Sequence, residues 1–200
     1  QTSVSSGDAG LTQRGTVQVG ASSGSLLQRQ GALRVSSDGH TLTSADGTPF
    51  FWLGDTVWDA PLRATEIEWQ QYLRDRASKG FSVVQISLAP TWSATTDVQG
   101  QRPFVDDDLR RPNQTFWQAF DRKVQLANDG GLAVLVVGLM DPLDQGQNDY
   151  GAAQTIGRYL AARLVGNHVI FSPSFDLPYW DMADETAKAI REVAPNHLIT

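Results

Sequence analysis

TEIEWQQYLRDRASKGFSVVQISL, residues 65–88, has the pattern of a helix that ends at a glycine and is followed directly by a strand. Thr65 and Glu68 have the three-residue spacing of a capping box, and apolar residues recur behind them at helical spacing. Gly80 stands where a helix commonly ends. SVVQISL (82–88) is nearly continuously apolar, as in a strand buried on both faces of a parallel sheet. This stretch therefore predicts one helix–strand unit of an α/β fold.

The same unit recurs along the chain. The other apolar strand runs are FFWLG (50–54), AVLVVGL (133–139), HVIFS (168–172) and HLIT (197–200), with helical patterns over about 113–130, 149–165 and 181–194. Such alternation predicts a parallel sheet covered by helices, either a doubly wound open sheet or a (β/α)8 TIM barrel. No GxGxxG motif follows the first strand, which argues against a nucleotide-binding open sheet. The loops that follow the strands are rich in aromatic and charged residues, which favours the barrel.

The number of strands points to part of a barrel. A complete barrel has eight strands and typically about 250 residues, whereas five strand runs are found here. We expect an N-terminal β-hairpin segment, with tight turns at Asp38-Gly39 and Asp46-Gly47, and about the first five barrel strands. The Ser-, Gly- and Gln-rich residues 1–30 predict a flexible leader, and residues 31–200 the folded domain. We expect a monomer whose C-terminal barrel half is missing from this segment.

Composition excludes several classes of partner. The formal net charge is −6, with three lysines and no basic run, which argues against nucleic acid. No apolar stretch reaches the roughly 20 residues of a membrane span. There is no cysteine, and the three histidines are scattered, so no metal site or cofactor is expected. The chain starts at Gln1, and Asn113-Gln114-Thr115 is an N-glycosylation sequon, so we expect a secreted, extracellular protein glycosylated at Asn113.

Polar and aromatic residues gather after the predicted strands. Barrel sites lie at the carboxyl ends of strands, where this sequence places Asp55, Thr56, Trp58, Asp59, Gln85, Ser87, Trp92, Asp141, Asp144, Ser174, Asp176, Tyr179 and Trp180. Carboxylates beside aromatic platforms are what glycoside hydrolysis requires. One carboxylic acid protonates the leaving oxygen, and a second carboxylate attacks the anomeric carbon or activates water.

From about Leu33 to Thr200 the chain resembles the apiosidase-like glycoside hydrolases. The matching segments are LRVSSDGHTL, GTPFFWLGDTVWD, EIEWQQYLRDRASKGFSVVQ, RPFVDDDLRRPNQTFWQAFDRKVQLANDGGLAVLV, IGRYLAARLVGNHVIFSPSFD and AIREVAPNHLIT. The resemblance implies a (β/α)8 barrel that hydrolyses glycosidic bonds in plant or microbial polysaccharides. It places the general acid at Asp176 and the second carboxylate on a Glu beyond Thr200.

Two segments depart from the family pattern. Ser174-Phe175 replaces the paired glycines before the acid, and the segment 137–142 replaces a Leu-Pro-Thr-Trp-Gly motif that includes a sugar-stacking tryptophan. The alternative function is therefore a non-catalytic glycan-binding module on a degenerate hydrolase barrel.

Five residues are the predicted sugar contacts: Asp55, Trp58, Gln85, Trp92 and Trp180. Asp55 has a structural alternative as a turn cap, and Trp58 has one in packing. The buried amide of Gln85 needs a partner, either Asp55 or a sugar hydroxyl. The acidic run 106–108 is expected to pair with Arg110 and Arg111 in a solvated loop.

Overall fold

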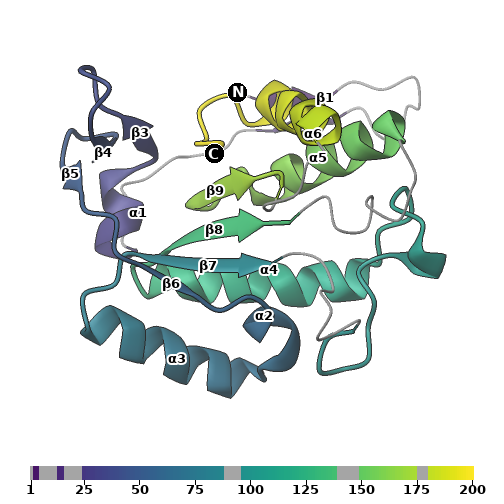
Figure 1. The fold of residues 1–200 in the computed structure, drawn as a ribbon, viewed down its shortest axis with the longest axis horizontal. Helices are drawn as coiled ribbons and strands as arrows, with labels where there is room; N and C mark the ends of the chain where they lie inside the picture. Colours follow the sequence, from purple (N-terminus) through teal and green to yellow (C-terminus); the bar gives the residue numbers. More distant parts are fainter. Residues whose placement is uncertain (1, 5–12, 16–23, 88–95, 139–148, 175–179) are drawn as a thin grey trace.

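In the computed structural model, strands and helices alternate as the sequence predicts (Figure 1). The structure describes residues 2–4, 13–15, 24–87, 96–138, 149–174 and 180–200. Four parallel strands form the main sheet in the order β6 (Gly54–Thr56), β7 (Val83–Ser87), β8 (Ala133–Val137) and β9 (Val169–Ser172). Ile199 forms a parallel bridge with Phe171, where the fifth strand is predicted.

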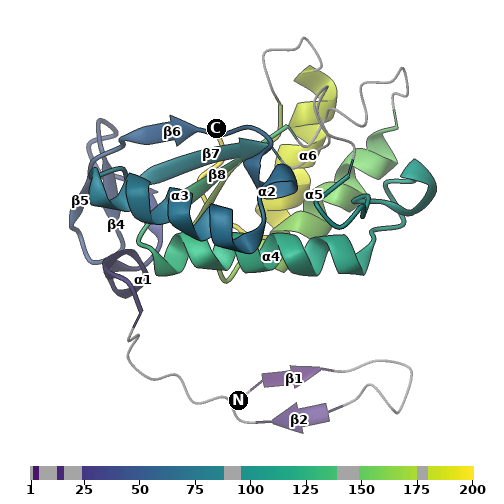
Figure 2. The same ribbon diagram turned by 90° about the horizontal axis from the view of Figure 1, so that it is seen from below.

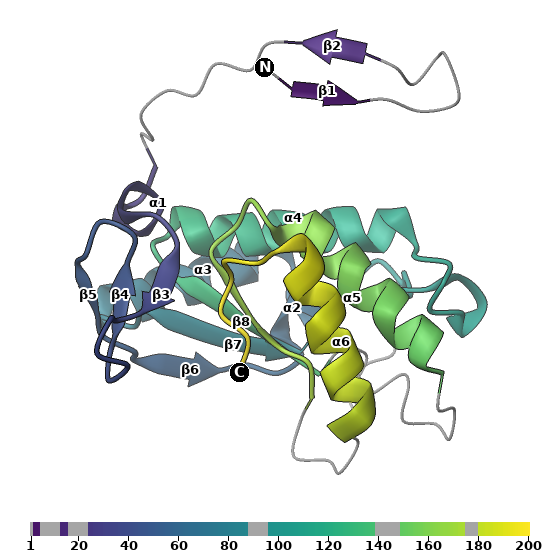
Figure 3. The ribbon, with the colours of Figure 1, turned by 90° about the horizontal axis from the view of Figure 1, so that it is seen from above.

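One face of the sheet, the helix-covered face, packs against α3 (Glu66–Ser78), α4 (Gln114–Asp129), α5 (Tyr150–Leu164) and α6 (Trp180–Val193), as Figures 2 and 3 show. Its buried strand residues are Val84, Ile86, Val134, Val136, Val169 and Phe171. The opposite side, the inner face, carries Val83, Ala133, Leu135, Val137 and Ile170. Because successive strand residues point to opposite faces, a polar residue's position in a strand decides whether it faces the helices or the inner side.

The four predicted helices, α3 to α6, begin and end close to the predicted residues, whereas the short helices α1 (Leu26–Gln30) and α2 (Ala60–Arg63) were not predicted. The capping box of α3 is present: Glu68 N–H donates to Thr65 Oγ1 at 3.3 Å, and Thr65 N–H donates to Glu68 Oε2 at 2.8 Å. Gly80 follows α3 with φ of 81°, a conformation that favours glycine. None of the helices in the described ranges is long and apolar enough to cross a membrane.

The N-terminal segment forms a small antiparallel sheet at the end where the parallel strands begin (Figure 1). Its strands are β3 (Leu33–Val35), β4 (Leu42–Ser44) and β5 (Pro49–Phe50). The glycines of the two predicted turns, Gly39 and Gly47, have φ of 75° and 90°, so both turns are confirmed.

Ordered elements also lie within the predicted leader. Helix α1 (Leu26–Gln30) buries Leu27, and the hydroxyl of Ser25 donates to the carbonyl of Asn128 at 2.6 Å. These residues therefore belong with the folded domain. Further toward the N-terminus, β1 (Thr2–Val4) pairs with β2 (Gln13–Gly15).

The first barrel strand differs from its prediction. We expected a buried strand over 50–54, but β6 starts at Gly54, and Phe50 pairs with β4. The side chains of Phe51, Trp52 and Leu53 are 77%, 39% and 37% exposed. Ser82 holds this connection, because its hydroxyl donates to Phe51 O at 2.6 Å and accepts from Leu53 N–H at 2.9 Å.

Candidate active face

The carboxyl ends of the parallel strands bring polar side chains into two adjacent rows on the inner face. Strand register aligns Thr56 with Gln85, and in the next row Ser87 with Val137 and Ser172. Ser87 is fully buried. We call this edge of the inner face the candidate active face.

Gln85 lies on the candidate active face, half-buried, as predicted. Its carbonyl accepts from Val57 N–H at 2.9 Å, which continues the ladder beyond β6. Asp55 faces the other side of the sheet and is not its partner. Within the described part of the chain no side-chain hydrogen bond of Gln85 is found, so of the two partners considered, the sugar hydroxyl is the one left open.

Trp58 follows β6 and lies on the same side of the sheet as Gln85. It is half-buried and packs against the apolar cluster of the inner face. Its carbonyl accepts from Ser87 N–H at 2.7 Å, so the backbone of Trp58 is fixed to β7. This placement is compatible with both predicted roles, packing and sugar contact.

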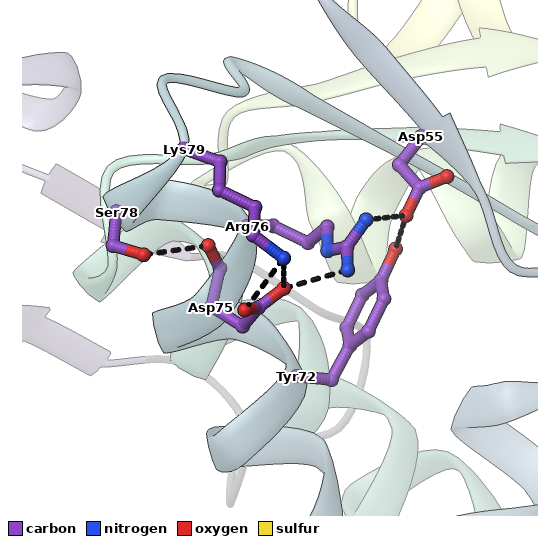
Figure 4. A network of polar contacts seen from close by, with 6 residues as sticks. All are labelled: Asp55, Tyr72, Asp75, Arg76, Ser78 and Lys79. Atoms are coloured by element: carbon purple, nitrogen blue, oxygen red, sulfur yellow. Dashed lines mark hydrogen bonds and ion pairs between the residues drawn. The ribbon is translucent and has the colours of Figure 1, made fainter.

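Asp55 faces α3 (Figure 4). It is in register with Val84 of the helix-covered face, and its Oδ2 accepts from Tyr72 Oη at 2.8 Å and Arg76 Nη1 at 3.1 Å. Burial and the hydrogen bond to Asp55 raise the pKa of Tyr72 well above its usual value, so this phenol stays a donor. Asp55 thus joins β6 to α3. This is a structural role, but it is not the turn cap that the sequence suggested as an alternative, because Asp55 lies within β6.

Arg76 is the centre of the network in Figure 4. Its guanidinium pairs with Asp75 at 2.6 Å as well as with Asp55, and it lies against the rings of Tyr72 and Phe81 at 5.4 and 5.3 Å. Rings on which the guanidinium lies help to fix its orientation. The side chains of Asp55 and Arg76 are 30% and 25% exposed, so the pair is more shielded than a typical surface salt bridge.

Replacing Asp55 by Asn is expected to lower the free energy of unfolding by about 1–3 kcal/mol, because a charged acceptor of two hydrogen bonds is lost. The affinity for glycans is expected to stay unchanged, because Asp55 faces α3 and not the candidate active face. Urea denaturation of the intact protein and glycan titration measure the two effects. The matched control is Asp184→Asn, which breaks an exposed pair with Lys188 and should cost less than about 0.5 kcal/mol. Lost glycan affinity with unchanged stability would instead support the predicted sugar contact.

The loop that follows β7 is held by ion pairs. Arg111 pairs with Asp106 as predicted, but Arg102 pairs with Asp107. Arg110 reaches Asp149, the N-cap of α5, with Nη2 at 2.7 and 2.6 Å from its two oxygens. Arg110 also interacts with the acidic run, because its backbone N–H donates to Asp108 Oδ1 at 2.9 Å. Its guanidinium, however, pairs with Asp149 and connects this loop to the start of α5.

Asn113 caps α4, since its Oδ1 accepts from Thr115 N–H at 3.1 Å. Its Nδ2 donates to Arg102 O at 2.9 Å and to Gln101 Oε1 at 3.1 Å. N-glycosylation at Asn113 stays a prediction, and it would replace one of these two hydrogens.

Several predicted site residues fall outside the described side chains. Asp176 and Trp92 lie outside the described residues, as do Asp141, Asp144 and Phe175. Trp180 opens α6, but its side chain is likewise not described. The carbonyl of Ser174 accepts from the Ser172 hydroxyl at 3.1 Å.

Ser172, which faces the inner side one row above Gln85, was not among the predicted site residues. Its signal in the sequence is the two-residue alternation within HVIFS.

Two histidines lie at the opposite end of the sheet, where the strands begin, as predicted. His168 and His197 line a cavity of about 210 Å³ together with Leu33 and Leu198. Burial and the nearby His197 lower the pKa of His168. Among the described residues, no three His, Cys, Asp or Glu side chains come together as metal ligands would.

A parallel sheet with helices on one face, and with polar residues at the strand ends on the other, is the arrangement of part of a (β/α)8 barrel. The model of the apiosidase-like catalytic domain matches residues 36–200, and the chain belongs to this family.

Solved glycoside hydrolases share this architecture. One is 26% identical with a TM-score of 0.78, and the match covers 88% of this chain and 42% of that one. A family 5 glycoside hydrolase from Bacteroides vulgatus ATCC 8482 is 26% identical with a TM-score of 0.77, over 89% and 41%. The exo-β-1,4-mannosidase Op5Man5 from Opitutaceae bacterium strain TAV5 shares the fold at 18% identity, with a TM-score of 0.63 over 83% and 34%.

The chain thus spans only 42% and 41% of the length of the first two of these hydrolases. None of the curated protein sequences compared with the chain matches it.

Proposed function

We propose that this chain is the N-terminal part of a glycoside hydrolase that cleaves glycosidic bonds in plant or microbial polysaccharides. The observation that carries the proposal is membership of the apiosidase-like catalytic domain family over residues 36–200. The polar rows that include Gln85, Ser87 and Ser172 support it, because they lie at the strand ends where barrel enzymes bind their substrates.

In the proposed mechanism Asp176 protonates the glycosidic oxygen as the bond to the anomeric carbon breaks. A second carboxylate, from a part of the protein beyond Thr200, attacks that carbon or activates a water. Gln85 bonds a sugar hydroxyl, while Trp58, Trp92 and Trp180 offer aromatic faces to sugar rings. Asp55 holds β6 to α3 and makes no contact with the sugar.

Further strands are proposed to complete the barrel beside β6. This strand stands at the edge of the main sheet, and the exposed apolar residues 51–53 directly precede it. Open parallel edges and adjoining apolar surface favour association with another strand. We propose that the closing strands come from the same polypeptide, which makes the complete protein a monomer. We also propose that the protein is secreted and carries a glycan at Asn113.

The second candidate function is glycan binding without cleavage. It is motivated by Ser174-Phe175, which stands where the family has paired glycines before the acid. A phenylalanine side chain at a position that needs close backbone approach would reshape the sugar pocket.

The test is to incubate the intact protein with a panel of plant and microbial oligosaccharides and polysaccharides. Chromatography is expected to detect cleavage products from at least one glycan, and calorimetry measures binding to the same panel. Binding without products would overturn the hydrolase proposal in favour of the glycan-binding module. If no glycan of the panel is bound or cleaved, the result would contradict both the hydrolase and the glycan-binding proposal.

A further inference from the structure

Lys123 is a buried cation in the middle of α4. Its side chain is 8% exposed, and its ammonium group donates to the carbonyl of Pro61 and, at 2.8 Å, to that of Ala64. These acceptors lie 62 and 59 residues away in sequence. A buried lysine needs such partners, because an unpaired charge in the interior is strongly unfavourable.

The two carbonyls belong to Pro61, the second residue of the single-turn helix α2 (Ala60–Arg63), and to Ala64, its C-cap. The last carbonyls of a helix have no partner within it, and a positive charge there also complements the helix dipole. Pro61 and Leu62 are buried, whereas Arg63 is exposed and Ala64 is half-buried. Lys123 therefore provides donors to both carbonyls from the buried side of α2.

Lys123 also connects neighbouring elements. Its own carbonyl accepts from Trp69 Nε1 of α3 at 3.0 Å. Burial lowers the pKa of Lys123, while the charges of Asp97, in the loop after β7, and Glu66, at the start of α3, act in the opposite direction. The ammonium thus lies within electrostatic range of Asp97 in the loop after β7 and of Glu66 at the start of α3.

The segment 57–64 is held at both of its ends. At its start, Val57 and Trp58 are bonded to β7 through Gln85 and Ser87. At its end, the only side-chain donor to Pro61 and Ala64 among the described residues is Lys123. We propose that Lys123 is a positioning residue that fixes α2 and thereby sets the orientation of Trp58 on the candidate active face.

The first test compares Lys123→Met, which removes the donors, with Lys123→Arg, which retains charge and donors. Hydrogen exchange of the intact protein is measured by mass spectrometry. In Lys123→Met, exchange in 57–64 is expected to rise about tenfold or more, because hydrogen bonds to a charged group are lost. Exchange in β8 should stay unchanged, and Lys123→Arg should restore part of the protection. The control is Lys188→Met, on an exposed lysine of α6.

Two outcomes would overturn the proposal. One is unchanged exchange in 57–64. The other is an equal rise in all peptides, which would assign Lys123 to global stability. If Lys123→Met does not fold, Lys123→Gln keeps an amide donor without the charge, and the same comparison of 57–64 with β8 applies.

The effect on substrate rests on the proposed function. For a cleaved glycan, Lys123→Met is expected to raise KM about tenfold with little change in kcat, because a sugar contact equal in ground and transition states is lost. A fall in kcat of about tenfold with an unchanged KM would contradict the proposal that Lys123 acts by positioning Trp58. If the wild type cleaves no glycan, the proposed function fails, while the exchange measurement still decides the role of Lys123.

Discussion

Asp176→Asn in the intact protein is expected to lower kcat about 10²–10⁴-fold on the best natural glycan, the usual contribution of a general acid. The amide cannot protonate the glycosidic oxygen, so the leaving sugar must depart as an alkoxide. The loss should be much smaller on an aryl glycoside whose phenol leaves without protonation. The alkaline limb of the pH–rate profile, which reports the acid, should disappear in the variant. Steady-state kinetics on the two substrates measure these effects.

The matched control is Asp181→Asn, an exposed carboxylate at the start of α6. It lies five positions from Asp176 and should keep kcat within about threefold, as surface substitutions generally do little. An equal loss on both substrates would show that Asp176 holds the fold or binds the sugar. An active Asp176→Asn variant would place the general acid elsewhere on the face.

The four long helices could be predicted closely because their signals are local, whereas the short helices α1 and α2 were not predicted. A capping box such as Thr65 with Glu68 determines where α3 begins, and Gly80 follows its end, whatever the rest of the chain does. The start of β6 could not be predicted in the same way. Four consecutive apolar residues at 50–53 predict a buried strand, but they do not state what covers them, and Phe51 is 77% exposed here.

The sequence also did not predict to which face of the sheet Asp55 points. Asp55 was expected in the loop after a strand over 50–54, but β6 covers 54–56, so the pleat directs Asp55 toward α3. Gln85 lies within β7, where the sequence predicted a strand, and its apolar neighbours alternate between the two faces. Its contact with a sugar stays a prediction.

The position of Lys123 on α4 is itself a sequence signal for an unusual lysine. It follows Phe116 by seven residues and Phe120 by three, which puts it on the apolar stripe of α4. A lysine on such a stripe indicates either an exposed edge of the helix or a buried cation with dedicated acceptors. The sequence cannot choose between them, because the acceptors are backbone carbonyls about 60 residues away. Every residue has a backbone carbonyl, so no residue type in the sequence indicates that a carbonyl accepts from Lys123.

Trp117→Ala is expected to lower the free energy of unfolding by about 3–5 kcal/mol, the usual cost of deleting a buried aromatic side chain. Trp117 is 1% exposed and packs edge-on against the rings of Phe104, Phe120 and Tyr159. These rings come from the loop after β7, from α4 and from α5, so the cavity would loosen three elements together. The midpoint of urea denaturation of the intact protein measures the change. Since whole domains are stable by only about 5–15 kcal/mol, the variant should be close to unfolding at physiological temperature.

A second variant separates the packing of Trp117 from its hydrogen bond. The indole Nε1 donates to Pro103 O at 2.8 Å, and the same carbonyl also accepts from Asn113 N–H at 2.9 Å. Trp117→Phe would therefore remove one of the two hydrogen bonds of this carbonyl, at about 0.5–1.5 kcal/mol. Because Pro103 belongs to the loop after β7, Trp117→Phe should also speed proteolysis within 96–113 more than within α5. The control is Tyr150→Ala, whose side chain is 42% exposed and whose loss should be small. If Trp117→Ala were as mild as this control, the aromatic cluster would not be what anchors the loop to α4. The loop after β7 would then have to be held by its ion pairs, which salt would weaken, and by hydrogen bonds such as that from Asn113 Nδ2 to Arg102 O.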